Sequence, residues 1–279
     1  MCHQIFYICF KYLKKTKMKK AITIILMMLI TSISFSQQLI SHSSVRVDES
    51  DKKGYLELEE FWSLVQEQAI KDGYAQRWMI WEFLQNEGED SEGNPDFLIM
   101  NFYKDSLQKS KTSNINWKDY AKKVYKGKLS KSKFEKKWNL PTGKRNFYEL
   151  ERLDNTYWQG GDLEKGMEIT MNVFKSLNED YEDYEMKFFK KLHEKNILNG
   201  SKKWWEFNRV VSSNVTTTSS TDGTPTHSTI DIAGREQSEE ETKGFWENLT
   251  FEDRMMIKNG LASRDLMGQY RLKLLMSKF

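Results

Sequence analysis

The chain is poor in cysteine and histidine, the side chains most often used as metal ligands, nucleophiles and bases. Its two cysteines, Cys2 and Cys9, lie near the N-terminus, and only four histidines are spread over 279 residues. The sequence contains no glycine-rich phosphate loop, no H-E-x-x-H or G-x-S-x-G motif and no Cys/His spacing of a metal site. These absences exclude a recognisable nucleotide, zinc-peptidase or serine-hydrolase site, and we expect no metal centre.

Residues 1–36 have the features of an export signal. A Met-Lys-Lys segment at 18–20 is followed by thirteen largely apolar residues at 21–33 and a small-x-small site at 34–36. We expect cleavage after Ser36 and a periplasmic or extracellular protein of bacterial type. The apolar run is shorter than the about 20 residues of a spanning helix, so an uncleaved anchor is the alternative. A complete signal begins at Met18, so we interpret the preceding residues as the result of start-site choice.

Removal of this leader changes how the composition is interpreted. The leader holds six of the 43 basic residues and none of the 40 acidic ones, so residues 37–279 have a formal net charge of −3. A basic net charge is the main argument for a nucleic-acid partner, and residues 37–279 do not have one. The mature chain would have no thiol, no disulfide and no transmembrane segment, and would depend on its apolar core for stability.

The rest of the chain shows the same pattern twice. Phe61 is followed twelve residues later by Gly73 and then by an aromatic strand, and Phe188 is followed twelve residues later by Gly200 and another aromatic strand. Glycine commonly follows the last residue of a helix because it adopts a left-handed conformation without strain. Each half therefore predicts a helix that ends before its glycine and leads into a strand.

Apolar periodicity predicts the order β-α-β-β-α-β in both halves. In the first half the strands are expected at 39–48, 77–85, 96–104 and 146–153, with helices at 58–72 and 116–138. In the second half the strands are expected near 167–173, 203–212, 226–234 and 268–276, with helices at 184–199 and 239–259. An acidic hairpin loop, 86–96, joins the second and third strands, and Thr250 with Asp253 predicts a capping box inside the last helix.

This order is that of the ferredoxin-like fold, an antiparallel sheet with helices on one face. The strand at 77–85 is apolar on both faces, since Trp78 and Ile80 alternate with Met79 and Trp81. A sheet that is apolar on both sides needs a second cover, and the sheet of the other half could provide it. We therefore predict an α+β fold with two ferredoxin-like repeats, 37–159 and 160–279, packed as a pseudo-dimeric barrel.

With Gly73, Gly200 and the aromatic second strands as its motifs, the sequence resembles the dimeric α+β barrel superfamily. That superfamily includes the antibiotic-biosynthesis-monooxygenase-like and haem-degrading domains. The resemblance covers Leu39 to Phe279 at the level of element order. It implies a small apolar pocket between helices and sheet, or between the sheets, that often holds haem or an aromatic substrate. No catalytic residue of the family can be matched to a position here, so no activity is implied.

Polar side chains in the middle of strands are the first group of candidate site residues. Counted from the repeated glycines and prolines, Glu82 is equivalent to Arg209, and Asn101 is equivalent to Asp231. Such groups cost a few kcal/mol if buried without partners, so they should pair or face a cavity. Pairing of Arg209 with Glu82 or Asp231 is the main expectation, and ligand contact or exposure at the sheet rim are the alternatives. His227 and Asp231, on one strand face, are weak catalytic candidates as an acid/base pair.

Tryptophans in the strands are the second group. Trp81, Trp204 and Trp205 could line an aromatic pocket or provide a stacking surface, and core packing is the alternative. We therefore expect an exported protein that binds a small apolar or aromatic ligand in a barrel pocket. One alternative is a cofactor-poor monooxygenase-like or haem-modifying enzyme, and another is an interaction protein with a filled barrel. A cavity of about 300 Å³ or more between the sheets would favour binding.

Overall fold

The computed structural model describes residues 38–84, 94–158, 163–215 and 223–279. The expected export signal and most of the expected acidic loop lie outside these residues. Residues 37–279 form one compact unit. None of the helices in the described ranges is both long enough and apolar enough to cross a bilayer.

Both halves contain the expected order of strands and helices. The strands are β1 (Leu39–Arg46), β2 (Arg77–Leu84), β3 (Phe97–Tyr103), β4 (Lys144–Asn155), β5 (Glu168–Ser176), β6 (Lys202–Ser213), β7 (His227–Ala233) and β8 (Arg264–Lys278). The helices of the first half are α3 (Lys52–Lys71), α4 (Ser106–Ser113), α5 (Trp117–Val124) and α6 (Lys131–Trp138). Those of the second half are α7 (Tyr181–Asp183), a π-helical segment (Tyr184–Phe189), α8 (Lys190–Leu198), α9 (Glu239–Glu247) and α10 (Phe251–Ala262).

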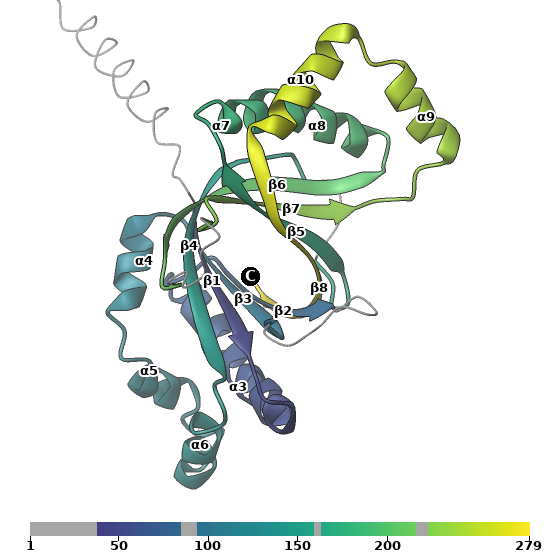
Figure 1. Ribbon diagram of the computed structural model, residues 1–279. Coiled ribbons are helices and arrows are strands. Elements are labelled where there is room, and N and C mark those ends of the chain that lie inside the picture. Colours follow the sequence, from purple (N-terminus) through teal and green to yellow (C-terminus); the bar gives the residue numbers. More distant parts are fainter. Residues whose placement is uncertain (1–37, 85–93, 159–162, 216–222) are drawn as a thin grey trace, which may run out of the picture. The chain divides into compact units, whose positions relative to one another are not determined.

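The strands close into an eight-stranded barrel in the order β1-β3-β2-β8-β5-β7-β6-β4. Within it, the first half contributes the antiparallel run β4-β1-β3-β2 and the second half the equivalent run β8-β5-β7-β6. Two antiparallel seams, β2–β8 and β4–β6, join the halves. The α+β barrel expected from the sequence is therefore confirmed, whereas an origin by duplication stays a prediction. Figure 1 shows the strands surrounding the C-terminal end of the chain, with the helices outside the ring.

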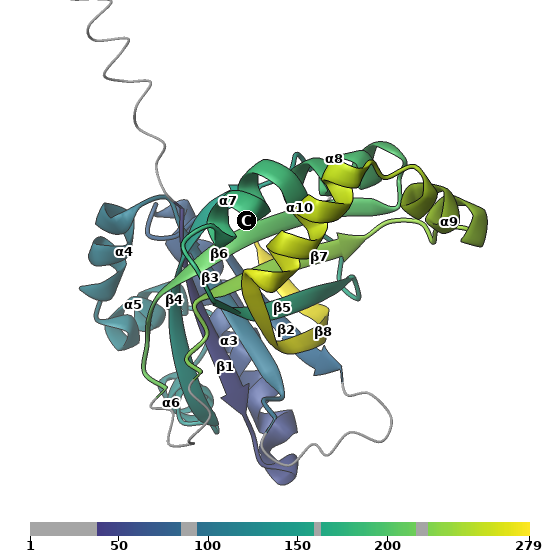
Figure 2. The same ribbon diagram turned by 45° about the horizontal axis from the view of Figure 1, so that its top comes forward.

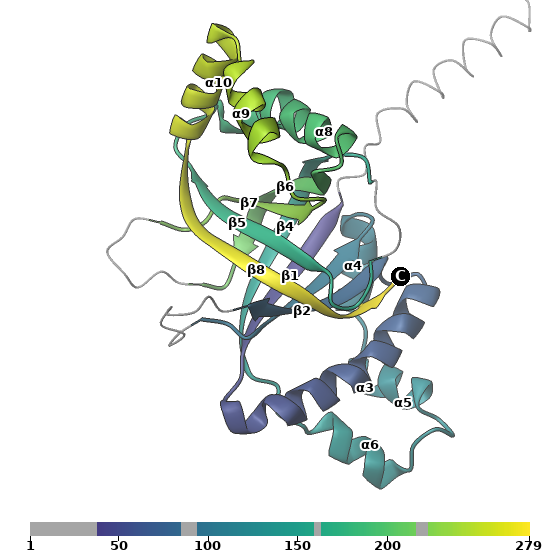
Figure 3. The ribbon, with the colours of Figure 1, turned by 90° about the vertical axis from the view of Figure 1, so that its right-hand side faces the viewer.

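The helices form an outer layer on two sides of the barrel. Figure 1 places α3 to α6 beside the first half and α7 to α10 beside the second. Figure 2 shows α7, α8 and α10 over the strands of the second half, and Figure 3 shows the long strand β8 running from α10 to the C-terminus. Each sheet thus has one face toward the helices and one toward the interior.

Helix α3 shows how the sequence produces this layer. Its residues Leu58, Phe61, Val65 and Ala69, at helical spacing, are all buried, as their periodicity predicts. The helix ends at Lys71, and Gly73 follows with a φ of +77°, a conformation that favours glycine. The expected helix face and its end are therefore confirmed.

Two sets of apolar side chains occupy the two faces of the strands. One cluster lies inside the barrel and takes residues from strands of both halves, including Met79, Leu150, Ile230 and Leu272. The other clusters lie between the sheets and the helices, for example Trp78 and Ile80 with Tyr55 of α3. Alternation along β2 therefore places Met79 and Trp81 inside, and Trp78 and Ile80 outside, as expected.

Candidate functional site

The barrel interior is not filled at one end. A cavity of about 510 Å³ opens there and lies among residues of six strands, the segment after β4, the segment before β5 and the C-terminal residue. The described lining residues are Arg77, Met79, Trp81, Met100, Phe102, Arg152, Trp158, Leu163, Ile169, Trp204, Glu206, Ile230, Ile232 and Phe279. Its volume falls in the range of small-molecule sites and exceeds the roughly 300 Å³ that favours binding.

Most of this lining is apolar and rigidly placed. Met79, Met100, Ile230 and Ile232 are nearly fully buried strand residues, so their side chains are fixed by the packing of the barrel. Trp81 is 2% exposed. These walls can surround a flat apolar molecule without a rearrangement of the fold.

The mouth of the cavity carries the charged groups. Arg152 of β4 donates to Glu206 of β6 at 2.5 Å, and Asn208 donates to the same carboxylate at 3.1 Å. Only 14% of the Arg152 side chain and 4% of the Glu206 side chain are exposed. Arg77 lies at the start of β2, on the same rim. The ion pair between Arg152 and Glu206 crosses the β4–β6 seam and links the two halves at the site.

Aromatic rings frame this charged rim. The Arg152 guanidinium lies 5.7 Å from the centroid of the Phe102 ring and 5.9 Å from that of Trp204. Trp158 meets Trp204 edge to face at 5.8 Å. Ring faces attract cations and also offer stacking surfaces for a flat ligand.

Of the residues expected to line a pocket, the structure places Trp81 and Trp204 in this cavity. Their role in binding stays a prediction. Trp205 lies on the opposite face of β6, 1% exposed, where its ring stacks on His193 at 5.0 Å. Its neighbour Trp204 faces the cavity instead. Because adjacent strand residues point to opposite faces, only one of two consecutive tryptophans can line the barrel.

The polar mid-strand residues lie on the outer faces of the sheets. Glu82 pairs with Lys273 at 2.9 Å, and Asp231 pairs with Lys202 and accepts from Asn172. Asn101 lines a second crevice, of about 290 Å³, between β3 and the helices of the first half. The outer position follows from alternation, since their strand neighbours occupy the interior.

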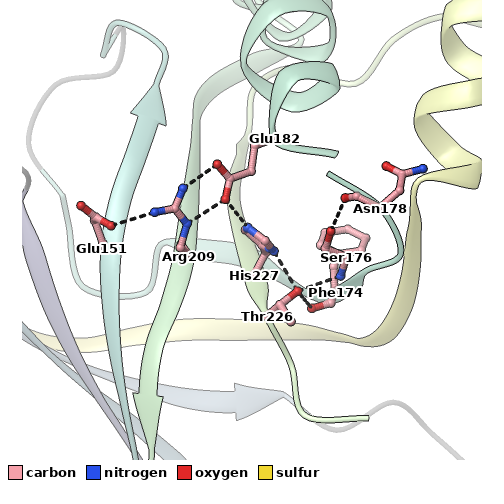
Figure 4. A network of polar contacts seen from close by, with 8 residues as sticks. All are labelled: Glu151, Phe174, Ser176, Asn178, Glu182, Arg209, Thr226 and His227. Atoms are coloured by element: carbon pink, nitrogen blue, oxygen red, sulfur yellow. Dashed lines mark hydrogen bonds and ion pairs between the residues drawn. The ribbon is translucent and has the colours of Figure 1, made fainter. Parts of the chain in front are cut away.

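Arg209 does not pair with Glu82 or Asp231, so that expectation is wrong. Its guanidinium instead donates to Glu182 of α7 at 2.5 Å and to Glu151 of β4 at 3.3 Å (Figure 4). The hydrogen bonds from Arg209, and then that from His227, hold the pKa of Glu182 below its usual range. Arg209 thus connects a helix with two strands.

His227 also has a different partner from the one expected. Its Nε2 lies 3.0 Å from Glu182 and its Nδ1 lies 2.8 Å from the Thr226 hydroxyl, whereas Asp231 is not among its contacts (Figure 4). Burial lowers the pKa of His227 despite the nearby carboxylate. An ionised Glu182 can only accept, so neutral His227 carries its proton on Nε2 and accepts from Thr226 on Nδ1. Both ring nitrogens are therefore used within the fold.

The functional candidates that the sequence analysis missed are Arg77, Arg152 and Glu206. Arg152 and Glu206 each carried a usable signal, because both are charged residues inside an expected strand. Their pairing across a seam became visible only with the strand order, since 54 residues separate them in the chain.

No protein-family model matches the sequence. No curated protein matches it either. Among solved structures, a provisionally assigned monooxygenase from Fusobacterium nucleatum is similar to this chain. It is 10% identical, with a TM-score of 0.49 and coverage of 88% of this chain and 95% of that one. A provisionally assigned monooxygenase from Lactobacillus acidophilus is 9% identical, with a TM-score of 0.47 and coverage of 87% and 96%.

A haem-binding protein from Thermus thermophilus is also similar, at 8% identity and a TM-score of 0.40, with coverage of 86% and 92%. Similarities of this strength carry no argument about function, so the function of this chain is inferred from its own strand order and cavity.

Proposed function

We propose that the barrel of this protein binds a small aromatic or otherwise apolar molecule. The observation that carries the proposal is the cavity of about 510 Å³, which is bounded mainly by buried apolar side chains. An open cavity of this kind argues against the interaction protein with a filled barrel. The cavity is concave and mostly apolar, as small-molecule sites usually are, and apolar walls provide most of the affinity in such sites.

A neutral two-ring probe, 2-naphthamide, tests this proposal by isothermal titration calorimetry. Replacement of a wall residue, Ile230→Trp, should fill the cavity and weaken binding at least tenfold. The matched control is Val211→Trp, because Val211 is also a β-strand residue but is 59% exposed. Equal affinity of the wild type and the Ile230 variant would show that the probe does not enter the barrel. Native mass spectrometry of protein from its own source would then identify any natural ligand.

A second candidate function is cofactor-independent oxygenation of the bound molecule. It rests on Glu206, a buried carboxylate at the cavity wall that could accept a proton from an acidic substrate. Oxygen uptake with anthrone, measured for the wild type and for Glu206→Gln, tests it. No uptake above the uncatalysed rate by the wild type would remove this candidate.

Haem does not fit the described cavity well. No His, Cys or Tyr is present among the described lining residues, and these are common ligands of haem iron. The thioethers of Met79 and Met100 line the wall, but methionine usually ligates haem iron together with histidine. Titration with haemin should therefore leave the Soret band of free haemin unshifted, and a saturable shift would restore the haem alternative.

We also propose that the protein is exported. The compact unit begins at Gln37, next to the expected cleavage site after Ser36, and the first strand begins at Leu39. Removal of the leader would therefore leave the barrel complete. Mass spectrometry of the protein from periplasmic and extracellular fractions should find Gln37 at its N-terminus, and an intact leader would contradict the proposal.

A further inference from the structure

A second hollow lies outside the barrel, between the sheet of the first half and its helices. This crevice measures about 290 Å³, which is at the lower end of the range of small-molecule sites. Residues of α3, α4, α5 and β4 line it together with Trp78 of β2 and Ile99 of β3, which are both buried. None of its described lining residues also lines the barrel cavity, so the two hollows are separate.

The charges in this crevice balance each other. The charged side chains among its described lining residues are Glu59 and Arg145, which pair at 3.2 Å. The Glu59 side chain is 2% exposed, and the Nε of Arg145 also donates to the carbonyl oxygen of Thr142 at 3.1 Å. A guanidinium has five N–H groups, more than these two contacts use. The fold thus fixes a carboxylate acceptor beside N–H donors, without net charge.

The second half contains the same kind of ion pair in a closed setting. Glu185 of the π-helical segment pairs with Arg264 at the start of β8. The Arg264 guanidinium lies 4.5 Å from the centroid of the Phe174 ring and 5.0 Å from that of Phe189. Aromatic rings therefore cover this guanidinium, whereas Arg145 lines an open crevice. An ion pair of this kind does not by itself require an open space beside it.

Two tryptophans give the crevice aromatic walls. Trp62 of α3 and Trp117 of α5 both line it, with ring centroids 5.9 Å apart and planes at 74°. Trp62 also contacts the ring of Trp138 at 5.5 Å, and Trp117 contacts that of Tyr120 at 5.7 Å. Neighbouring rings thus hold both side chains in place, and a flat apolar face of a ligand can stack on them.

An amide completes the set of polar groups. Asn101 of β3 lines the crevice, and its side chain makes no hydrogen bond with any residue that the structure describes. Its position is fixed by the backbone, because β3 is paired with β1 on one side and β2 on the other. An amide both donates and accepts hydrogen bonds. The fold gains no hydrogen bond from this group, so it is available to a ligand.

We propose that this crevice binds a neutral sugar, either a single pyranose ring or the terminal unit of a saccharide. The C–H face of a pyranose can stack on Trp62 or Trp117. Its adjacent hydroxyls, each a donor and an acceptor, match the paired Glu59 and Arg145 and the Asn101 amide. A charged ligand would find no counter-charge beside a pair that is already neutral, and an apolar ligand would leave these polar groups without bonds.

Saturation-transfer difference NMR with methyl glycosides of D-glucose, D-galactose, D-mannose and N-acetyl-D-glucosamine tests the inference. At least one of them should bind the wild type saturably, with a Kd of about 1 mM or lower. Asn101→Leu should weaken that binding by about tenfold or more, without lowering the urea midpoint, since the amide has no partner in the fold. The matched control is Asn146→Leu on β4, because Asn146 is exposed and does not line the crevice.

A second pair of variants blocks the crevice by size. Ser113→Trp should weaken sugar binding, because Ser113 is an exposed residue of α4 at the crevice, whereas Ser110→Trp on the same helix should not. Ile230→Trp fills the barrel cavity and should leave sugar binding unchanged. No saturable binding of any of these glycosides by the wild type would overturn the inference. Full affinity in both Asn101→Leu and Ser113→Trp, or loss of affinity in Ile230→Trp, would place the sugar elsewhere and also overturn it.

Discussion

Arg152 is the residue at which the site and the fold depend most closely on each other. It lines the cavity, and it also supplies the partner of the buried Glu206 across the β4–β6 seam. Loss of one member of a buried pair leaves the other charge without compensation, which costs more than the net contribution of the pair.

We therefore predict that Arg152→Met destabilises the protein by about 3–5 kcal/mol. The double variant Arg152→Met/Glu206→Met should recover most of this loss, because it removes both charges and keeps the volume apolar. Urea denaturation of the two single variants and the double variant measures the coupling. Additive effects would contradict the prediction.

His42 gives the fold a pH dependence. Its side chain is buried inside the barrel, its Nε2 has no hydrogen-bond partner among the described residues, and burial lowers its pKa to about 3. The unfolded chain binds a proton near pH 6.5, whereas the folded chain does not. The folded state therefore has its full stability with respect to His42 above pH 6.5, where the histidine is neutral in both states. This stability is lost progressively as the pH falls toward 3.

We predict that this one histidine reduces the free energy of unfolding by about 1.4 kcal/mol for each pH unit below 6.5. Urea denaturation between pH 7.5 and 5.0 measures the slope. Desolvation also lowers the pKa values of His193 and His227, so they contribute to the slope of the wild type. The difference between the wild type and His42→Leu isolates His42, and identical slopes would contradict the prediction.

At the scale of elements, helix α10 packs tightly against the π-helical segment through a glycine. A Cβ atom added at Gly260 would lie 2.6 Å from the ring of Phe189. Phe189 is itself 8% exposed, so its ring has little room to move. The close approach of the two helices therefore requires the absence of a side chain at this position.

Gly260→Ala should destabilise the protein by about 1–3 kcal/mol through overpacking. The matched control is Gly244→Ala in α9, where an added Cβ has no atom within 4 Å. That change should stabilise the helix by roughly 0.5–1 kcal/mol. Thermal unfolding followed by circular dichroism distinguishes the two, and equal shifts in Tm would show that the α10 contact is loose.

The elements themselves were largely predictable from the sequence, because their signals are local. Periodicity in α3 and the capping box of Thr250 and Asp253 in α10 are both confirmed. Helix α4 was missed, since Ser106–Ser113 is short and mostly polar, and its start depends on a hydrogen bond from Gln108 to the Asp105 side chain. Such a helix has no strong apolar face to reveal it.

The site was less predictable, because it depends on which face of each strand points inward. In β6, Trp204 and Trp205 are followed by a mixture of polar and apolar residues that leaves both faces partly apolar. The pairing of β6 with β7 also contains an irregularity between Lys202 and Trp204. Local sequence cannot show which face of β6 points inward. It also cannot show that β4 pairs with β6 and so brings Arg152 to Glu206, since both facts depend on the strand order.

For the whole molecule, the two seams make each half depend on the other. Strands β2 and β4 of the first half pair with β8 and β6 of the second, and the interior apolar cluster takes residues from both. Separation of the halves would expose that apolar face and leave four strands with an unpaired side.

We therefore predict that residues 37–279 unfold in a single cooperative transition. Tryptophan fluorescence and far-ultraviolet circular dichroism should give the same midpoint in urea, because loss of either half opens the cavity and the seams together. Two separate transitions would show that the halves are independently stable and that the seams contribute little.

Closure of the barrel also limits how other proteins can recognise this one. Each of the eight described strands has a hydrogen-bonded neighbour on both sides. An extended peptide, or a strand from a misfolded copy, finds no vacant row of backbone donors and acceptors on which to extend the sheet. Strand addition to the described ring would therefore first require the ring to open.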